Sequence, residues 1–532
     1  MLIDKAIKLA IENVKKEGLT DIFLEPFEVS LLKSKDFCTF LAEQIRARIT
    51  SNSLQGLKVH PINHVLFPKK DAYDFRRASL IQPIDTITYL ALVLIYADIV
   101  ENNRVEKRRN VVFSYRFKPN KGYLFDPKFS HTAFQSFVIN KSRNSRTKVL
   151  VKCDISNYYD RLNLHRLEST LLSLPIESKF VKLTNELLLF WANRDSYSLP
   201  IGGNASRILA EAALIAVDDY LLSLKIKFCR YVGDYRLFAP DAKTAHAWLT
   251  ILIERLYLEG LTINPSKTII EDVSNKSKKT SVTTEFKQKA SEIRQTRIIV
   301  GYTGTIPTKF RELSEKDVQE LKTATTKDLE DKINTSEILH PDDVKKFLRI
   351  IVAGGKYKKL GIFRKLIEKF PQFTPILIDL IIKKEAFIPE ILKQNISSYF
   401  SDLLAHSIKY PEYMLIAIVR LLGTKAYSNI NALMEFFRCL KRNSGAYVGR
   451  AVLDALENNV TRTDVLEIRQ YYSRADHWEK RAIIKIVNNT LSEEEKRPWL
   501  KNVKIHSAED YFTIECFDKK KDKKRKHKEN KL

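Results

Sequence analysis

The sequence predicts an α+β protein whose first part mixes helices with short strands and whose second part is almost entirely helical. Short runs rich in β-branched and aromatic residues, typical of strands, stand before residue 310. After about Pro341, apolar residues recur at spacings of three and four, the period of an amphipathic helix. Only 15 of the 532 residues are glycine, which favours long helices over many tight turns.

Four runs in the first part are predicted to be strands because valine, isoleucine, phenylalanine and tyrosine suit a pleated sheet. They are residues 111–115, 148–155, 227–233 and 297–302. The third run continues to residue 238 and is predicted to be two short strands around a turn at Val232, Gly233 and Asp234.

Eight segments in the second part have helical periodicity, and short breakers containing proline or glycine separate them. They are residues 359–370, 373–384, 388–409, 412–423, 429–442, 447–459, 462–474 and 477–489. Ser492 and Glu495 have the spacing of a capping box before one more short helix. Short connections predict a stack of HEAT-like helical repeats, and an irregular bundle is the alternative because no sharp repeat is visible.

The change in pattern predicts how the chain divides into domains. We expect a mixed domain over residues 1–310, with a basic connecting loop near 273–297. A helical-repeat domain is expected over 311–505. Residues 506–532 are rich in lysine and are expected to form a flexible basic tail.

The chain is strongly basic, with 90 lysines and arginines against 64 acidic residues and a formal charge of +26. Basic residues cluster at 104–109, 116–121, 141–148 and 276–309. Each cluster alone is typical of a solvated face, but together they indicate a nucleic-acid partner. Such binding is expected to weaken steeply as the salt concentration rises.

Cysteine usage and hydropathy exclude several classes of protein. The five cysteines are widely scattered and fit neither a disulfide framework nor a zinc site, which predicts a reducing compartment. The longest apolar run, residues 89–97, is about half of what a bilayer crossing needs. We therefore expect a cytoplasmic protein with no membrane partner.

A carboxylate stands where the second predicted strand ends. Asp154 closes that strand, and Asp160 follows after a turn with two tyrosines. A carboxylate at a strand end can project into a cleft, where it suits Mg²⁺ and nucleotide phosphates. Taken alone, an aspartate that caps a helix or forms an ion pair explains the pattern equally well.

Three further segments follow in order. Residues 199–214 form a glycine-containing turn before a helix, which lets the backbone approach a ligand closely, although an ordinary helix entry has the same pattern. Asp234 stands at the tip of the predicted 227–238 hairpin, where it meets Asp154 if the strands are neighbours. Residues 260–268 place Lys267 after a turn.

The ordered set resembles motifs A, B, C and D of the reverse transcriptase palm. Upstream, residues 75–92 and 111–117 resemble the finger motifs of the prokaryotic defence-associated branch, which includes the abortive-infection, AbiK-like enzymes. The resemblance covers roughly residues 60–300, and the helical remainder is similar only in architecture. It implies a fingers and palm domain followed by an all-α domain.

The resemblance implies a catalytic and metal-binding set. Asp154 and Asp234 match the aspartates that bind metal, with the carbonyl of Ile155 as a third ligand. Two Mg²⁺ ions, or Mn²⁺ in their place, activate the attacking oxygen and neutralise the leaving pyrophosphate. Lys267 matches the motif D lysine, which is expected to protonate the leaving group.

The resemblance also implies a nucleotide-binding set. Tyr159 matches the aromatic sugar gate that excludes a 2′-hydroxyl, and core packing is the alternative for this side chain. Ser206 lies in the motif B segment, and Arg76 or Arg77 is expected to hold the triphosphate.

The implied activity is RNA-directed or template-independent synthesis of DNA from dNTPs in an anti-phage defence system. The implied partners are RNA or single-stranded DNA, including a non-coding RNA, and either further copies of the chain or a partner reverse transcriptase.

Motif C departs from the family pattern because Gly233 stands where its first aspartate is expected. One interpretation is a working enzyme in which Asp234 serves as the ligand or Asp160 compensates. The other is a catalytically impaired pseudo-polymerase that binds nucleic acid or a partner subunit. The sequence leaves both open.

Overall fold

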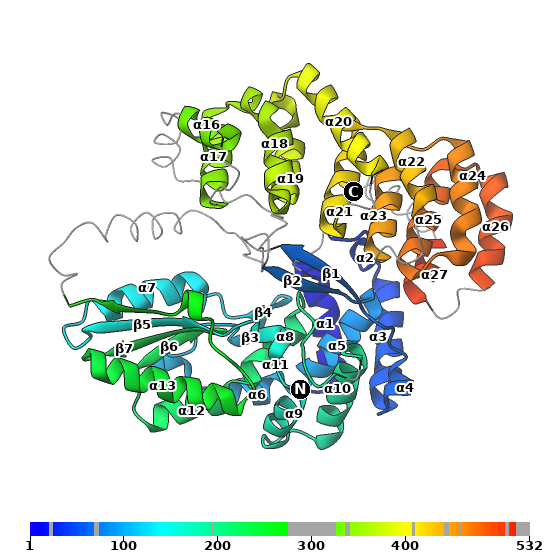
Figure 1. Ribbon diagram of the computed structural model, residues 1–532. Helices are drawn as coiled ribbons and strands as arrows, with labels where there is room; N and C mark the ends of the chain where they lie inside the picture. The colour runs from blue at the N-terminus through cyan, green and yellow to red at the C-terminus, as the bar shows by residue number, and fades with distance from the viewer. Residues whose placement is uncertain are drawn as a thin grey trace, which may run out of the picture. The chain divides into compact units, whose positions relative to one another are not determined.

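The computed structural model of the chain forms two compact units (Figure 1). The described residues are 1–20, 25–68, 74–193, 195–274, 326–335, 341–406, 410–440, 446–457, 459–505 and 510–517. The first unit contains the described residues of 1–62 and 81–274, and the second contains those of 63–80 and 326–517. The predicted connecting loop near 273–297 lies almost wholly outside the described residues, as do the predicted strand 297–302 and the boundary near 310.

A four-stranded antiparallel sheet in the order β6-β7-β5-β8 organises the first unit (Figure 1). Its strands are β5 (Val149–Asp154), β6 (Phe228–Tyr231), β7 (Asp234–Ala239) and β8 (Ile269–Asp272). The prediction of a strand ending at Asp154 is confirmed, and so is the prediction of a hairpin around residues 232–234.

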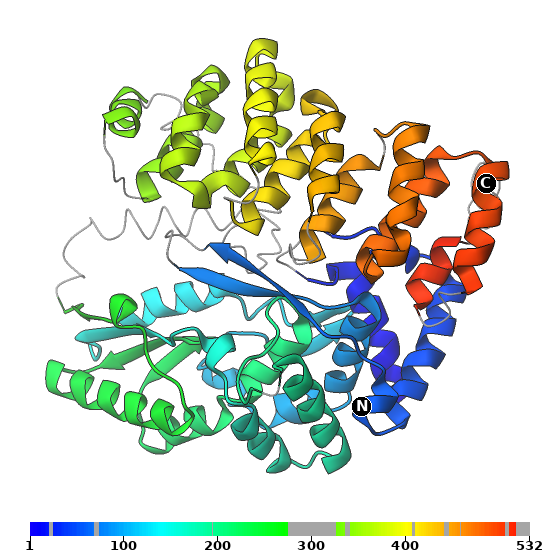
Figure 2. The same ribbon diagram turned by 45° about the vertical axis from the view of Figure 1, so that its right-hand side comes forward.

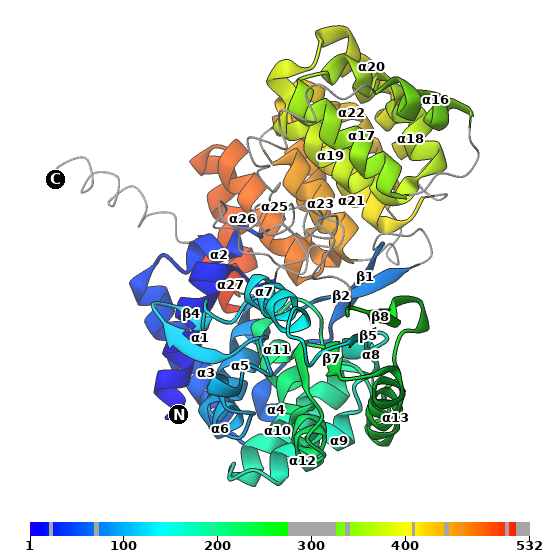
Figure 3. The same ribbon diagram turned by 90° about the vertical axis from the view of Figure 1, so that its left-hand side faces the viewer.

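Helices cover both faces of this sheet, with α7 (His131–Ser142) on one side and α13 (Ala242–Leu258) on the other (Figures 1 and 3). Period-two alternation turns Leu150, Cys229 and Phe238 to the α7 face, where they pack in one apolar cluster with Phe134 and Val138 of that helix. The cluster ends before Asp154 and Asp234, so these carboxylates stand beyond the apolar core of that face.

The rest of the first unit is mainly helical and surrounds α5 (Pro83–Leu94), all twelve residues of which are buried. The other helices are α1 (Ile3–Glu17), α2 (Glu28–Leu31), α3 (Lys35–Thr50), α4 (Leu54–Leu57), α6 (Ala97–Asn102), α8 (Tyr158–Arg161), α9 (Leu164–Leu172), α10 (Ser178–Trp191), α11 (Asn204–Ala212) and α12 (Ile215–Ser223). Strands β3 (Phe117–Asn120) and β4 (Tyr123–Phe125) form a separate two-stranded sheet. Within the described part of the chain, no helix is both long and apolar enough to cross a membrane.

Residues 111–115 do not form the predicted strand. They make only an isolated bridge between Val112 and Arg230. The Phe113 amide donates to the Arg230 carbonyl, and the Arg230 amide donates to the Val111 carbonyl. Tyr115 has a φ of 43°, a left-handed conformation that turns the chain out of line. The prediction of a strand over residues 111–115 is therefore wrong, and the run contributes only this bridge.

The second unit contains an antiparallel hairpin and a long series of helices (Figure 2). Its elements are β1 (Asn63–Pro68), β2 (Phe75–Leu80), α16 (Lys327–Thr335), α17 (Pro341–Gly354), α18 (Phe363–Lys369), α19 (Thr374–Lys383), α20 (Glu390–Ala405), α21 (Glu412–Leu422), α22 (Ile430–Cys439), α23 (Ala446–Leu456), α24 (Arg462–Gln470), α25 (His477–Thr490), α26 (Glu493–Ile505) and α27 (Tyr511–Phe517). The hairpin packs on α21 and α23, and the Phe75 and Tyr413 ring centroids lie 6.3 Å apart.

Alternate helices in this unit pack side by side, in the succession α19, α21, α23, α25 and α27. All eight helices predicted from periodicity are present, with ends shifted by a few residues. The predicted capping box is also present, because Ser492 Oγ accepts from the Glu495 amide and lies 3.1 Å from its carboxylate. HEAT-like repetition stays a prediction.

Two segments are grouped differently from the sequence-based expectation. The β1–β2 hairpin was expected in the mixed domain but clusters with the second unit. The expected tail contains a helix, α27, whose Phe512 and Thr513 are buried. The helix packs against α25 and α26, a contact that the lysine-rich composition of the segment does not predict.

Gly423 lies at a close approach between α21 and α23. A Cβ added there would stand 2.6 Å from Ala455 Cβ and 2.8 Å from Ala455 Cα, so backbone would have to move. We expect Gly423→Ala to lower the free energy of unfolding by about 1–3 kcal/mol, as overpacking does. Chemical denaturation of the full chain measures this. Gly361→Ala is the matched control, since a Cβ there meets nothing within 4 Å; equal midpoints for both variants would contradict the prediction.

Candidate active site

Two carboxylates stand side by side on adjacent strands. The register pairs Asp154 of β5 directly with Asp234 of β7, and Lys152 with Arg236 two residues further along. Because side chains alternate with a period of two, all four project from the same face of the sheet. The prediction that the two aspartates meet is confirmed.

The backbone after Asp154 draws a third segment to the site. The Asp154 carbonyl accepts from the Asn264 amide at 2.7 Å, and the Ser156 amide donates to the Thr262 carbonyl at 2.8 Å. Asn264 caps the short 3₁₀ helix η2 (Pro265–Lys267) by accepting from the Ser266 amide. This pairing holds Lys267 beside the end of β5.

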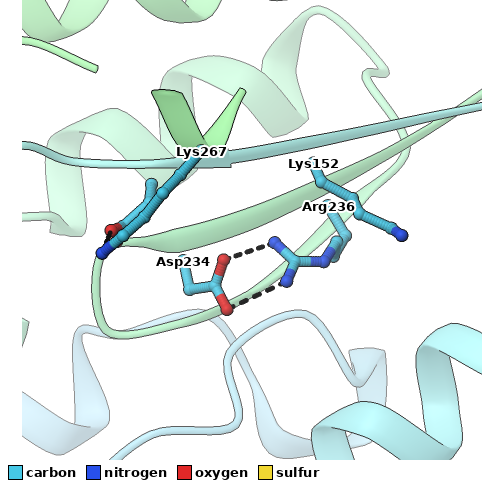
Figure 4. Close-up of a pocket in the computed structure, with 5 residues that line it drawn as sticks. Lys152, Asp234, Arg236 and Lys267 are labelled. Carbon is cyan, nitrogen blue, oxygen red and sulfur yellow. Dashed lines mark hydrogen bonds and ion pairs between the residues drawn. The ribbon is translucent and has the colours of Figure 1, made fainter. Parts of the chain in front are cut away.

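Each aspartate forms an ion pair with a basic side chain (Figure 4). Lys267 Nζ lies 2.9 Å from Asp154 Oδ2. Both terminal nitrogens of Arg236 contact the Asp234 carboxylate, with Nη2 at 3.0 Å from Oδ2. These four residues and Lys152 line a pocket of about 280 Å³.

The Asp234 carboxyl has a perturbed pKa. Burial raises its pKa, and the negative charge of Asp154 adds to that rise, while Arg236 and His131 oppose it. His131 begins α7, and its ring meets the Tyr231 ring edge-on at 5.2 Å. The site therefore sets a partly buried acid between a carboxylate and two basic groups.

Oxygen ligands for a divalent cation are present but few. Asp154 and Asp234 fit the preference of Mg²⁺ for oxygen, and an ion held by two carboxylates would keep several waters. The Ile155 carbonyl stays a predicted ligand. Within the described ranges, no three or more His, Cys, Asp or Glu side chains gather closely enough to hold a metal. At Gly233, an added Cβ would stand 3.1 Å from Ile155 Cβ, so a carboxylate there requires Ile155 to shift.

The turn that carries Asp234 has a strained backbone and fixed partners. Val232 has a φ of 54°, which is rare for a β-branched residue and costs on the order of 1–3 kcal/mol. Ser114 Oγ accepts from the Val232 amide at 2.8 Å, and Arg230 Nη1 donates to the Val232 carbonyl at 3.1 Å. The Gly233 carbonyl accepts from the Ile155 amide at 3.0 Å. These bonds hold the strained turn beside β5.

A buried ionic network lies beneath this turn. Arg230 is fully buried and donates to Asp218 at 2.7 Å and to Glu211 at 2.9 Å. Arg104 donates to the same Glu211 oxygen at 2.6 Å, and the Ser114 hydroxyl donates to the other. Burial raises the pKa of Asp218 although Arg230 opposes the rise, and burial would raise that of Glu211, but Arg230 and Arg104 lower it.

The sequence analysis did not predict this buried network, and it interpreted two buried arginines as part of basic surface clusters. Arg104 and Arg116, assigned to basic surface clusters, are only 6% and 2% exposed. Arg116 instead pairs with Glu101 at 2.9 Å. An arginine inside an apolar strand, as at Arg230, was the available signal, because a buried charge needs a partner. Alternation along β5 and β7 would also have indicated Lys152 and Arg236.

Two residues of the predicted nucleotide-binding set are buried away from the pocket lining. Tyr159 is 7% exposed, its ring meets Tyr158, and its carbonyl accepts from the Leu199 amide at 2.9 Å. Ser206 is 1% exposed and its hydroxyl lies 3.1 Å from that of Tyr89. Both side chains are thus packed in the interior of the first unit.

The other predicted residues are not among those that line this pocket. Arg76 and Arg77 belong to β2 in the second unit, where they pair in register with Phe67 and Leu66. Asp160 lies in α8 and is not part of the pocket lining. The roles predicted for all these side chains stay predictions.

Residues 69–291 match the family model described as reverse transcriptase (RNA-dependent DNA polymerase). The match spans less than half of the 532-residue chain and supports reverse transcriptase or DNA nucleotidyltransferase activity. No curated protein matches the sequence.

Several solved telomerase structures are similar. Apo telomerase from Candida tropicalis truncated from its C-terminal domain has 14% identity and a TM-score of 0.30, covering 43% of this chain and 55% of that chain. Telomerase from Candida albicans in complex with the TWJ fragment of telomeric RNA has 12% identity and a TM-score of 0.31, covering 81% and 71%. The chain thus spans about half the length of the first of these structures.

Proposed function

We propose that this chain is a DNA polymerase that transfers nucleotidyl groups from dNTPs, directed by RNA or without a template. The observation that carries the proposal is the direct pairing of Asp154 with Asp234 on adjacent strands beside a pocket. The match of residues 69–291 to the reverse transcriptase family supports the same activity.

Asp154, Asp234 and the Ile155 carbonyl would hold the divalent cation, Mg²⁺ or Mn²⁺. When bound, such an ion supplies activation of the attacking oxygen and neutralisation of the departing pyrophosphate. Lys267 would deliver a proton to the leaving group, and its exposed side chain, with Nζ 2.9 Å from Asp154 Oδ2, supports this role. The network under Val232 keeps Asp234 in register with Asp154.

We further propose that the polymerase serves in anti-phage defence in the cytoplasm, as an AbiK-like enzyme. The finger-like segments at residues 75–92 and 111–117 and the helical second unit support this subtype. The expected partners are RNA or single-stranded DNA, including a non-coding RNA, and further copies of the chain or a partner reverse transcriptase. The formal charge of +26 favours such polyanions.

A pseudo-polymerase is the second candidate. Gly233 removes one carboxylate from the motif, and both remaining aspartates form ion pairs with basic side chains. A chain of this kind would bind nucleic acid beside an active partner and incorporate no nucleotide.

Incubating the full chain with labelled dNTPs and Mg²⁺ or Mn²⁺, with and without an RNA template and primer, separates the two candidates. We expect labelled DNA from the wild type and strongly reduced incorporation by Asp154→Asn. Bound RNA without product under every condition would overturn the polymerase and favour the pseudo-polymerase. Sequencing the nucleic acid that co-purifies with the chain identifies the template.

A further inference from the structure

Arg236 stands out because the sequence motifs assign it no role, yet it lies in the pocket. It is two residues after Asp234 on β7, and its side chain is 18% exposed. Nη1 donates to the Tyr235 carbonyl at 2.8 Å, and the guanidinium carbon lies 5.4 Å from the Phe134 ring centroid of α7. This packing keeps the guanidinium at the pocket wall.

The register sets a second cation opposite. Lys152 and Arg236 are direct cross-strand partners, so their Cβ atoms are about 5 Å apart. Like charges at that separation repel each other unless an anion lies between them. Lys152 Nζ donates to Glu271 at 2.5 Å, so this cation is neutralised there. Arg236 is neutralised by its ion pair with Asp234 (Figure 4).

The pocket lining as a whole is therefore unusual for a site that binds cations. Three of its five side chains are basic and two are acidic, and Gly233 provides no third carboxylate nearby. A divalent cation that binds Asp234 competes with the Arg236 guanidinium, which contacts both carboxylate oxygens. The displaced guanidinium presents a planar fork that matches phosphate oxygens.

We propose that Arg236 binds polyphosphate in this pocket. When a divalent cation binds Asp234, the Arg236 guanidinium leaves that carboxylate and binds the nucleotide phosphates. The proposal deepens the proposed polymerase function and rests on it for the identity of the nucleotide. Lys152, the cross-strand partner of Arg236, would add a second positive charge on leaving Glu271 for the same phosphates. In the absence of ligand, Arg236 acts as the internal counterion of Asp234.

Two titrations of the full chain, freed of nucleic acid at high salt, test the proposal. Inorganic tripolyphosphate is titrated by calorimetry at a saturating concentration of Mg²⁺, and Mn²⁺ alone is titrated by electron paramagnetic resonance. We expect Arg236→Gln to weaken tripolyphosphate binding by about tenfold or more, as loss of a charge-assisted contact does. The same variant should bind Mn²⁺ more tightly, because Asp234 loses its competing cation.

The controls separate a ligand from a structural residue. Arg166→Gln removes an exposed arginine of α9 outside the pocket lining and should change neither affinity. Arg236→Lys keeps the charge and should retain part of the tripolyphosphate affinity. The proposal is overturned if the wild type does not bind tripolyphosphate. It is also overturned if Arg236→Gln lowers the affinity for both tripolyphosphate and Mn²⁺, or leaves either affinity unchanged.

Failure of this proposal is distinguishable from failure of the proposed function, since neither titration involves polymerisation. Opposite changes in the two affinities without any dNTP incorporation would keep the phosphate site and refute the polymerase. Incorporation of dNTPs with both affinities unchanged by Arg236→Gln would keep the polymerase and refute the phosphate site.

Discussion

We expect Asp154→Asn to reduce dNTP incorporation by about 10²–10³-fold, because one preorganised charged contact at a reacting centre is commonly worth a few kcal/mol of barrier. The substitution keeps the shape of the side chain and the register with Asp234 but removes the negative charge that faces Lys267. Single-turnover incorporation with excess enzyme measures the effect.

Asp160→Asn tests whether that carboxylate compensates for Gly233. It lies in α8 outside the pocket lining, so we expect far less effect than at Asp154. Equal losses at both positions would show that Asp160 belongs to the catalytic set. Unchanged incorporation by Asp154→Asn would refute the site itself.

We expect Arg230→Met to lower the free energy of unfolding by about 3–5 kcal/mol, the typical cost of leaving buried charges without their partner. Arg230 is fully buried and is shared by Asp218 and Glu211, which are 2% and 1% exposed. Methionine fills a similar volume, so the loss reports the charge rather than a cavity. Chemical denaturation followed by circular dichroism measures it.

The same variant should depend on pH with a definite sign. Burial already raises the pKa of Asp218, and Arg230 is the main group that opposes the rise. Without Arg230 the folded-state pKa rises further above the unfolded value, so protonation stabilises the fold. That contribution is present at acidic pH and is lost as the pH rises through the folded-state pKa. The deficit relative to wild type should therefore be smaller at acidic pH than at neutral pH.

Two comparisons make this test specific. Arg166→Met, at an exposed position of α9, should change stability by no more than about 0.5 kcal/mol. Combining Arg230→Met with Asp218→Asn should restore part of the loss, because one unpaired charge is removed as well. A deficit that is equally large in the double variant, or that does not change with pH, would contradict the ionic explanation.

The two sets of predictions concern connected parts of the molecule. Arg230 bonds to the Val232 carbonyl, and Val232 leads through Gly233 to Asp234. Loss of Arg230 is thus expected to lower incorporation in addition to stability, because the turn that positions Asp234 loses a partner. The two effects separate when incorporation is measured well below the unfolding midpoint.

Much of the architecture followed from the sequence alone. Periodicity of three and four located α18 to α25, since an amphipathic helix buries one face wherever it packs. A β-rich run ending at Asp154 and a turn at Gly233 located the two strands that carry the aspartates. These are local signals, and the order of the motif-like segments connected them to one site.

Only the tertiary structure decided which charges meet. The sequence places Arg104 in a basic cluster and Arg230 in an apolar run, but whether they face solvent depends on packing by α11 and α12. In the same way, Arg236 became the counterion of Asp234 through strand register and the cover of α7. Periodicity follows from each residue's near neighbours, whereas burial and ion pairing follow from segments that meet only after folding.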